Sequence, residues 1–257
     1  MTRQTTVDRL HDMRLSAMAN AFESQCEDDT FESLSFEDRF GMLVDKEWEK
    51  RQNTKLGKLI KAAGFRYPNA CMEDIEYFAD RKLDKAQLLE LSTCRYISEG
   101  RHIILKGATG CGKTYLSNAL GNAACRNFIK VKYIRLPDLF VELSIAQAEG
   151  TFRKVIKFYQ RIDLLILDEF LLTPLTGEEA RMLLEIIEAK TRYGSVIFCS
   201  QFEPKGWIKR IGSEADATLA EATLDRFKHS SYIIDIKGDV SMRERHGIKS
   251  KAVVHHD

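Results

Sequence analysis

The feature that most constrains the fold is a glycine-rich octapeptide, GATGCGKT, at residues 107–114. It matches the pattern GxxxxGK(S/T) in full, follows the apolar run HIILK and precedes a stretch with helical periodicity. Glycines let successive backbone N–H groups turn toward one anion, and the helix that begins near Gly112 adds the positive end of its dipole. This context predicts a strand, a phosphate-binding loop and a helix, in that order.

The side chains of this loop have expected roles in binding ATP and a magnesium ion. Lys113 is expected to contact the β- and γ-phosphates, and the Thr114 hydroxyl to bind Mg²⁺. Cys111 is expected to fill the loop as a small residue, and a redox role is the alternative. The residues predicted to surround the phosphates are Gly107, Ala108, Thr109, Gly110, Cys111, Gly112, Lys113, Thr114 and Tyr115.

Short apolar runs alternate with amphipathic helices from about residue 84 onward. The runs are HIILKG, VKYIRL, DLLILDE, SVIFCS and YIIDI. Runs of this length that are separated by helices indicate buried parallel strands with crossover helices. We therefore predict an α/β domain over residues 84–257, with a parallel five-stranded sheet between helices.

The part of the chain before this domain has a different pattern. Residues 1–66 are predicted to form a small helical domain, in which an apolar stripe at three-to-four spacing extends from Val7 to Phe22. A second helix is expected to begin at Ser35, in a capping pattern. Glycine and proline then break the periodicity, so residues 67–83 are predicted to be a linker.

The composition limits the location of the protein and its partners. Apolar residues make up 44% and charged residues 30% of the chain, which allows a packed core, and the net charge of +1 does not by itself demand nucleic acid. There is no apolar run of membrane-spanning length and no apolar leader at the N-terminus, so we expect no membrane partner. The six cysteines lack CxxC spacing, which disfavours a zinc site and is typical of a cytoplasmic protein.

Polar residues end two of the other predicted strands. LLILDEF contains Asp168 and Glu169 at the carboxyl end of its strand, the edge at which open α/β sheets bind ligands. Asp168 is expected to hold Mg²⁺, and Glu169 to polarise the water that attacks the γ-phosphate. Ser200, near the end of VIFCSQF, is expected to sense the γ-phosphate; the alternative is a strand that simply leaves the core.

The set GATGCGKT, LLILDEF, FCSQF and TLDRFKH resembles the AAA+ ATPases of the IstB type. These are ATP-binding helpers of two-gene insertion sequences and relatives of the DnaC helicase loaders. The match covers about residues 84–245, and the helical N-terminus is also similar to this family. Two positions depart from the pattern, because Leu171 stands where the family often has glycine and Cys199 where it often has threonine.

The resemblance implies a P-loop AAA+ core and roles for two arginines. Arg226 in LDRF lies where the family has an arginine finger, which acts on the ATP of a neighbouring subunit and supplies about 10³ to 10⁵ in rate. Arg243 in SMRER lies where a second sensor arginine is expected. The residues alone allow another role for Arg226, a surface salt bridge with Asp225 or Glu221.

The resemblance also implies the partners. It implies a homo-oligomer that assembles with ATP on double-stranded DNA, with low sequence specificity, and that delivers this DNA to a partner transposase of the IstA type and stimulates it. The nearest alternative is a replicative helicase loader of the DnaC type with the same core. A metabolite kinase would need an arginine-rich lid, which we do not find. A scaffold without hydrolysis is disfavoured by Lys113, Asp168 and Glu169.

Two basic segments without acidic residues are candidate DNA surfaces. They are KRQNTKLGKLIKAAGFR at residues 50–66 and FRKVIKFYQR at residues 152–161, and each is either a DNA contact or a solvated helix face. In related initiators and helicase loaders, DNA-binding helices occupy the position of the second segment. We therefore predict that Arg153, Lys154 and Lys157 contact DNA phosphates, which gives little sequence preference.

Overall fold

The computed structural model describes residues 2–211, 221, 224–238 and 240–246. The chain forms two compact units, Met1–Lys58 and Leu59–Asp257. The division falls within a long helix, α3 (Phe36–Ala63). In the part of the chain that is described, no helix is both long and apolar enough to cross a bilayer.

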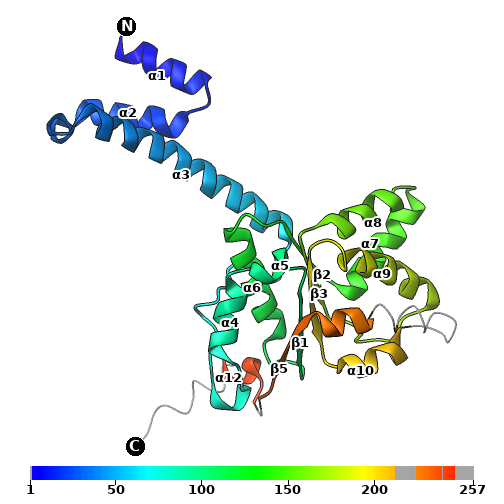
Figure 1. The fold of residues 1–257 in the computed structure, drawn as a ribbon. Helices are drawn as coiled ribbons and strands as arrows, with labels where there is room; N and C mark the ends of the chain where they lie inside the picture. The colour runs from blue at the N-terminus through cyan, green and yellow to red at the C-terminus, as the bar shows by residue number, and fades with distance from the viewer. Residues whose placement is uncertain (1, 212–220, 222–223, 239, 247–257) are drawn as a thin grey trace, which may run out of the picture. The chain divides into compact units, whose positions relative to one another are not determined.

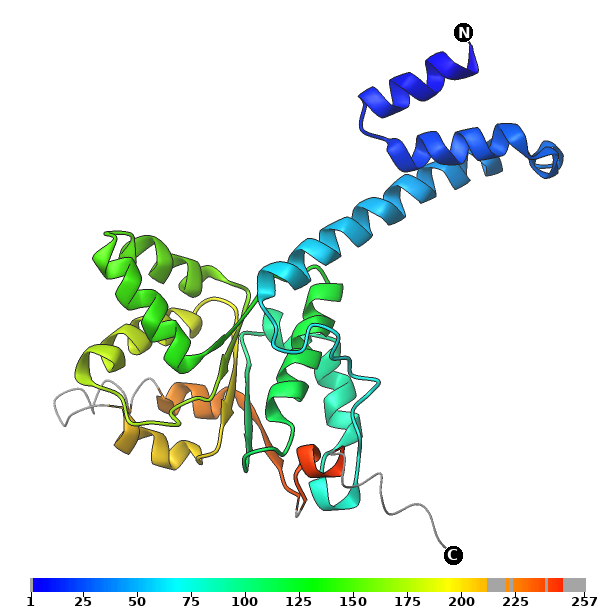
Figure 2. The same ribbon diagram turned by 180° about the vertical axis from the view of Figure 1, so that it is seen from behind.

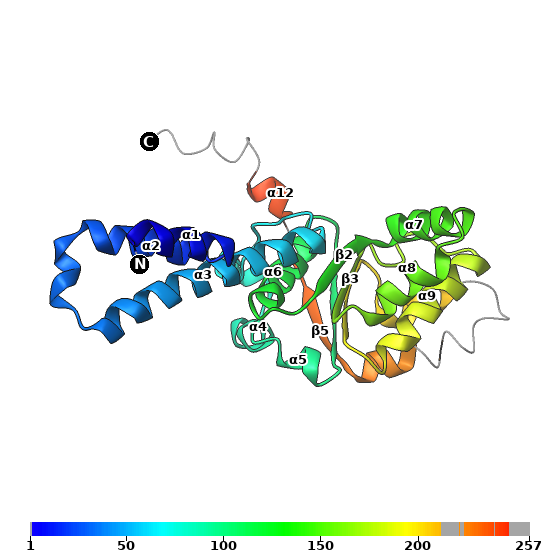
Figure 3. The same cartoon turned by 90° about the horizontal axis from the view of Figure 1, so that it is seen from above.

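The first unit contains α1 (Arg3–Asp12), α2 (Ser16–Glu27), the 3₁₀ turn η1 (Asp29–Ser33) and the first part of α3. Helices α1 and α2 lie side by side (Figure 3), and Val7, Leu10 and Ala19 form their small apolar core. The stripe predicted from Val7 to Phe22 is divided between the two helices. The division lies at Arg14, whose φ of 60° is left-handed and interrupts a right-handed helix.

Side chains of the first unit satisfy the free N–H groups at two helix starts. Ser35 precedes α3, as predicted, and its Oγ accepts a hydrogen bond from the Asp38 N–H at 3.1 Å. The buried Glu47 carboxylate of α3 accepts from the N–H groups of Ala17 and Met18 at the start of α2, at 3.0 and 3.3 Å. Because the first N–H groups of a helix lack partners within it, these contacts stabilise the helix starts.

The second unit is built on a five-stranded parallel sheet with the strand order β2-β3-β4-β1-β5 (Figure 1). Every predicted strand is present, and the α/β prediction is confirmed. The strands are β1 (His102–Gly107), β2 (Val131–Arg135), β3 (Leu164–Asp168), β4 (Ser195–Ser200) and β5 (Ser231–Ile236). The runs are almost wholly apolar because β1, β3 and β4 lie inside the sheet and are buried on both faces.

Helices cover both faces of this sheet (Figures 1 and 2). One face packs against α6 (Lys113–Arg126), with α4 (Lys85–Ser92) and α5 (Arg95–Ser98) on the same side. The other carries α7 (Leu136–Ala148), α8 (Phe152–Arg161) and α9 (Gly177–Lys190). The short elements α10 (Pro204–Trp207), η3 (Ile208–Arg210) and α12 (Met242–Arg245) complete the described part.

The segment predicted to be a linker, residues 67–83, lies within the second unit and packs against α6. The Asn118 side chain of α6 accepts from the Tyr67 N–H at 2.9 Å, and the Asn122 amide donates to the Pro68 carbonyl at 3.0 Å. The segment also includes the 3₁₀ turn η2 (Ala79–Arg81). These contacts hold the segment against α6, and Arg81 at the end of η2 contacts the phosphate loop through the Cys111 carbonyl.

Candidate functional site

The phosphate loop joins the end of β1 to the start of α6, as the motif predicts. A side chain on Gly107 would place its Cβ 2.4 Å from the Ile236 carbonyl oxygen. Gly112 has a left-handed φ of 96°, and a Cβ there would lie 2.9 Å from Nη2 of Arg81. Only glycine fits these two positions, so the close packing around the loop explains two of the three motif glycines.

Loop carbonyls hold the motif lysine at the start of α6. Lys113 Nζ donates to the carbonyls of Gly107 and Ala108, both at 2.7 Å, and lies 3.7 Å from Cys111 Sγ. The Met242 N–H donates to the Gly110 carbonyl at 2.9 Å, which attaches the start of α12 to the loop. The lysine ammonium thus lies over the loop where a phosphate would bind.

Asp168, at the end of β3, is 2% exposed and receives three hydrogen bonds. Its Oδ2 accepts from the Thr114 hydroxyl at 2.8 Å and from the Tyr133 hydroxyl at 2.7 Å, and its Oδ1 accepts from the Glu169 N–H at 2.9 Å. Burial and the adjacent Asp168 charge raise the pKa of Tyr133, which therefore stays a donor. The hydroxyl and carboxylate oxygens of Thr114 and Asp168 are the hard donors that Mg²⁺ prefers, so this pair fits the ion.

Glu169 follows the strand in a left-handed conformation, with φ of 52°. Its Oε2 accepts from Arg135 Nη2 at 2.6 Å, and this hydrogen bond raises the pKa of the Arg135 guanidinium. A non-glycine residue with positive φ costs of order 1–3 kcal/mol, and such residues cluster at functional sites. The carboxylate is thus fixed by its backbone and by one arginine.

The departure at Leu171 has a structural explanation. Leu171 has φ of 54°, in the region that favours glycine, and its side chain is fully buried. Arg210 donates from Nε to the Leu171 carbonyl and from Nη2 to the Leu172 carbonyl, both at 2.7 Å. These hydrogen bonds hold the turn after Glu169 in the conformation that glycine would adopt more easily.

Ser200 lies at the predicted edge but contacts the backbone behind Glu169. Its hydroxyl donates to the Phe170 carbonyl at 3.0 Å and accepts from the Phe202 N–H at 3.1 Å. The residue is 1% exposed. Ser200 is therefore connected to the phosphate site through the Phe170 backbone, which follows Glu169, rather than through an exposed hydroxyl.

Two pockets lie at the site, and residues of the phosphate loop line the first of them. The first, of 490 Å³, is lined by Tyr67, Arg81, Gly110, Gly112, Lys113, Thr114, Tyr115, Met242, Arg243 and His246. The second, also of 490 Å³, is lined by Arg66, Tyr133, Arg135, Glu169 and Arg243. Arg243 borders both pockets, and the Tyr67 and Tyr115 rings lie 5.9 Å apart in the first. The arrangement suits a nucleotide whose base lies near the tyrosines and whose phosphates lie along the loop.

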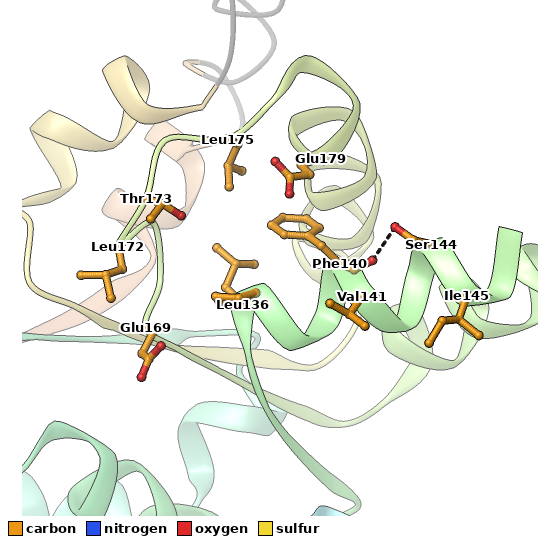
Figure 4. Close-up of a pocket in the computed structure, with 11 residues that line it drawn as sticks. Leu136, Phe140, Val141, Ser144, Ile145, Glu169, Leu172, Thr173, Leu175 and Glu179 are labelled. Carbon is orange, nitrogen blue, oxygen red and sulfur yellow. Dashed lines mark hydrogen bonds between the residues drawn. The ribbon is translucent and has the colours of Figure 1, made fainter. Parts of the chain in front are cut away.

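Glu169 also borders a third, mainly apolar pocket of 340 Å³ (Figure 4). Its walls come from one side of α7, from the segment after β3 and from Glu179 of α9. Val141 and Ile145 of α7 are 60% and 53% exposed, although both are large apolar residues. The surface next to the proposed water-activating residue is therefore apolar and open.

Arg226 is exposed and lies near the opposite end of the sheet from the loop. It belongs to the helical residues 224–229, and the neighbouring Phe227 ring lies 4.3 Å from that of His102, the first residue of β1. The loop follows the far end of β1, a strand that rises by about 17 Å. Asp225 pairs with His229 at 3.3 Å, and the preceding Thr223 of the quoted motif lies outside the described residues.

The predicted DNA contacts lie on α8, away from its apolar face. Arg153, Lys154 and Lys157 are exposed, whereas Ile156 and Tyr159 are buried against the domain. Helices α7 and α8 form a hairpin between β2 and β3 (Figure 1). The three cations therefore share the solvent-facing side of the helical hairpin that connects β2 to β3.

The sequence did not reveal several residues of the site. Tyr133 and Arg135 were read only as part of a strand, and Tyr67 and Arg81 as part of a linker. The spacing of Tyr133 and Arg135 is a usable signal, because alternate residues of a strand share one face. The register pairs Arg135 with Asp168, and hydrogen bonds join Tyr133 to Asp168 and Arg135 to Glu169. Nothing in the sequence marks Arg81.

Comparison with known proteins identifies the chain's relatives. The model of the family described as "IstB-like ATP binding protein" matches residues 8–251. An insertion-sequence ATP-binding protein from Sinorhizobium fredii is 34% identical over 250 residues, which are 97% of this chain and 100% of that protein. The ATP-binding protein of insertion sequence IS1162 from Pseudomonas fluorescens is 36% identical over 78% of this chain and 87% of that protein.

Solved structures share the fold at lower identity. DnaA from Aquifex aeolicus with bound AMPPCP has a TM-score of 0.57 and 21% identity, over 72% of this chain and 54% of that chain. The DnaC helicase loader has a TM-score of 0.53 and 19% identity, over 67% of this chain and 99% of that chain. These likenesses confirm the predicted AAA+ P-loop architecture of the second unit.

Proposed function

We propose that this chain, which belongs to the IstB-like ATP-binding protein family, hydrolyses ATP, assembles on double-stranded DNA and delivers that DNA to a partner transposase. The observation that carries the proposal is the cluster at the carboxyl end of β3. There Asp168 contacts Thr114 of the phosphate loop, and Glu169 is fixed beside it. A metal-binding pair next to a positioned carboxylate is the arrangement that ATP hydrolysis requires.

The chain's own residues divide the chemistry between them. Lys113 exchanges its contacts with the Gly107 and Ala108 carbonyls for the phosphates of ATP. Thr114 and Asp168 would hold Mg²⁺, which neutralises phosphate charge when bound. Glu169 accepts a proton from the attacking water, and its bond to Arg135 keeps the carboxylate aimed until the water arrives.

Self-assembly is supported by the positions of Arg226 and of the third pocket. Arg226 lies about one strand length from the loop of its own subunit, too far to reach the ATP bound there. A neighbouring subunit that supplies this arginine has to cover the surface around Glu169. That surface offers Val141 and Ile145, whose burial in the assembly would stabilise it.

The remaining parts of the proposal concern the DNA, the partner and the location. Arg153, Lys154 and Lys157 would contact DNA phosphates of any sequence. The transposase is supported by the insertion-sequence origin of the relatives. We place the protein in the cytoplasm because all six of its cysteines are free thiols. The helicase-loader alternative has only a fold likeness in its favour.

The test of this function is the mass of the full chain in solution, measured by light scattering with and without duplex DNA. ATP together with DNA is expected to give large assemblies, and ADP or no nucleotide to give smaller ones. Equal masses under all three conditions would contradict an ATP-dependent assembly. Addition of the cognate transposase then distinguishes delivery of DNA from simple coating, since stimulated strand transfer is expected only with ATP.

The predicted DNA contacts have their own test, a titration of duplex DNA binding at several salt concentrations. Each phosphate contact contributes about 0.9 to the slope of log affinity against log salt. Replacing Arg153, Lys154 and Lys157 by alanine should therefore flatten the slope by roughly 2 to 3 units per engaged subunit and leave ATP binding intact. An unchanged slope would show that α8 does not contact DNA, and residues 50–66 would become the candidate DNA-binding segment.

A further inference from the structure

Arg81 is a buried arginine that lies behind the phosphate loop. It ends the short turn η2, and only 4% of its surface is exposed. Its Nη2 donates to the Cys111 carbonyl at 3.1 Å, and its Nη1 donates to the Glu76 carbonyl. Both acceptors are neutral, so these bonds hold the guanidinium in place without compensating its charge.

No carboxylate among the described residues forms an ion pair with Arg81. Glu76 and Asp80 act on its charge, but the Glu76 carboxylate pairs with His246 at 2.8 Å and Asp80 pairs with Arg245. Burial lowers the pKa of Arg81 because Glu76 and Asp80 offset the cost of burying its charge only in part, although arginine remains protonated in proteins. The surroundings of Arg81 thus favour an additional anion.

The Nε atom of Arg81 is a buried donor that has no partner in the described part of the chain. The side chain lines the first pocket, together with Tyr67, Gly112 and Tyr115. Buried donors almost always have a hydrogen-bond partner in native structures. A ligand of this pocket would supply the missing acceptor, and the phosphate-loop residues in its wall indicate that this ligand is the nucleotide.

The position of Arg81 indicates which part of the nucleotide it contacts. Glu169, which is proposed to act at the γ-phosphate, lines the second pocket, and Arg81 is not part of that wall. Arg81 lies instead beside Gly112 and shares its pocket with the two tyrosines. A side chain in this pocket contacts the nucleoside diphosphate part of the nucleotide, which ATP and ADP have in common.

We propose that Arg81 is a nucleotide-binding residue that donates a charge-assisted hydrogen bond to the nucleoside diphosphate part shared by ATP and ADP. This inference rests on the nucleotide site proposed above and adds a second cation to it, besides Lys113. Because Arg81 also bonds Cys111, the same side chain fixes the loop around the anion that it binds.

The test is a titration of the full chain with ADP and with the slowly hydrolysed analogue AMPPCP. Arg81→Met removes the charge and keeps the length of the side chain, and Lys82→Gln is the matched control at the exposed neighbouring residue. Loss of a charge-assisted bond should weaken both nucleotides by about 10- to 100-fold, and by the same factor. Lys82→Gln should bind as the wild type does.

Thermal unfolding separates binding from a merely structural role. Without nucleotide, Arg81→Met should stay folded with a Tm close to that of the wild type, because removal of the buried charge offsets the loss of its bonds to the Cys111 and Glu76 carbonyls. The rise in Tm on addition of ADP should shrink in this variant. Arg81→Lys, which keeps a charge but lacks the Nε donor, should bind nucleotide more weakly than the wild type as well.

Two results would overturn the inference. One is wild-type affinity in Arg81→Met, and the other is a ligand-free Arg81→Met protein that is unfolded or unfolds well below the wild type. Both leave the proposed function intact if the wild type binds ADP. A wild-type chain that binds neither nucleotide would instead refute the proposed ATP site itself.

Discussion

The two ends of the parallel sheet place ionisable side chains in opposite environments. At the carboxyl ends, Asp168 and Glu169 accept hydrogen bonds from Thr114, Tyr133 and Arg135. These hydrogen bonds fix the positions of the two carboxylates. Because Mg²⁺ binding needs hard oxygen ligands and hydrolysis needs a positioned base, this edge is suited to chemistry on a phosphate.

The amino ends contain ionisable groups whose pKa values are lowered by burial. Lys190 is fully buried and donates to the Ile162 carbonyl, and burial lowers its pKa to about 7. His102 is 1% exposed, accepts from the Val196 N–H at 3.2 Å and has its pKa lowered by burial to about 4. Lys190 and His102 each form a hydrogen bond with a backbone group, and neither lines the two pockets at the nucleotide site. Burial of an ionisable side chain therefore does not by itself identify a functional residue.

The largest effect is expected from replacement of Arg226. This residue lies near the amino ends of the strands in its own subunit and is proposed to act at the carboxyl ends of the strands in a neighbouring subunit. Arg226→Ala should bind ATP normally and hydrolyse it about 10³- to 10⁵-fold more slowly. Lys228→Ala, at another exposed cation of the same helical segment, is the control and should keep wild-type turnover. The turnover of both variants is measured as steady-state ATP hydrolysis in the presence of DNA. Normal turnover in Arg226→Ala would refute the role of Arg226 as an arginine finger.

Glu169→Gln should have the next largest effect. The amide cannot accept a proton, so turnover should fall by about 10²- to 10⁴-fold while ATP binding is retained. Glu185→Gln, at an exposed position of α9, provides a control that removes the same charge elsewhere. Hydrolysis and nucleotide titration are measured on the same samples. Wild-type turnover in Glu169→Gln would show that another group activates the water.

Lys190 tests the amino end of the sheet through stability. Its pKa is about 7 in the folded chain against 10.5 ordinarily, so the unfolded chain binds more protons between these values. Stability should therefore rise as pH increases from 7 to 10.5, by on the order of a few kcal/mol. Lys190→Met should flatten this dependence in urea unfolding. An equal pH slope in both proteins would contradict the buried, uncompensated state of the lysine.

Tyr133→Phe should have the smallest effect and sharpens the comparison between the two ends. It removes one of the two hydroxyl bonds to Asp168 Oδ2, so the Mg²⁺ concentration for half-maximal hydrolysis should rise about tenfold. Tyr193→Phe removes a similar bond, 2.8 Å long, to Asp163 at the amino end and should leave the Mg²⁺ dependence unchanged. Equal changes in the Mg²⁺ dependence of the two variants would contradict the assignment of the Mg²⁺ site to the carboxyl end of the sheet.

The strands and the phosphate loop could be predicted because their signals are contiguous in the sequence. The motif carries its own strand, turn and helix, and the apolar runs are long enough to require burial on both faces. Asp168 and Glu169 could be placed at the same edge because parallel strands end together. Their assigned chemical roles remain predictions that the variants above test.

The rest of the site depends on contacts between distant segments. Arg135 meets Glu169 only through the register that pairs Arg135 with Asp168 across β2 and β3. Arg81 reaches the loop from a segment that is held against α6 by hydrogen bonds between the Asn118 and Asn122 side chains and its backbone. The Ser200 hydroxyl is occupied by the Phe170 carbonyl, a contact that position at a strand end does not reveal.

The central claim is that a residue near the amino end of one subunit completes the ATP site at the carboxyl end of the next. A mixture of Arg226→Ala and Lys113→Ala proteins tests it most directly, with co-purification of differently tagged copies to verify mixed assembly. Each variant alone should be nearly inactive. In the mixture, the intact loop of the arginine variant meets the intact Arg226 of the lysine variant, so part of the ATP hydrolysis should return. No recovery at any mixing ratio, with mixed assemblies verified, would contradict the account.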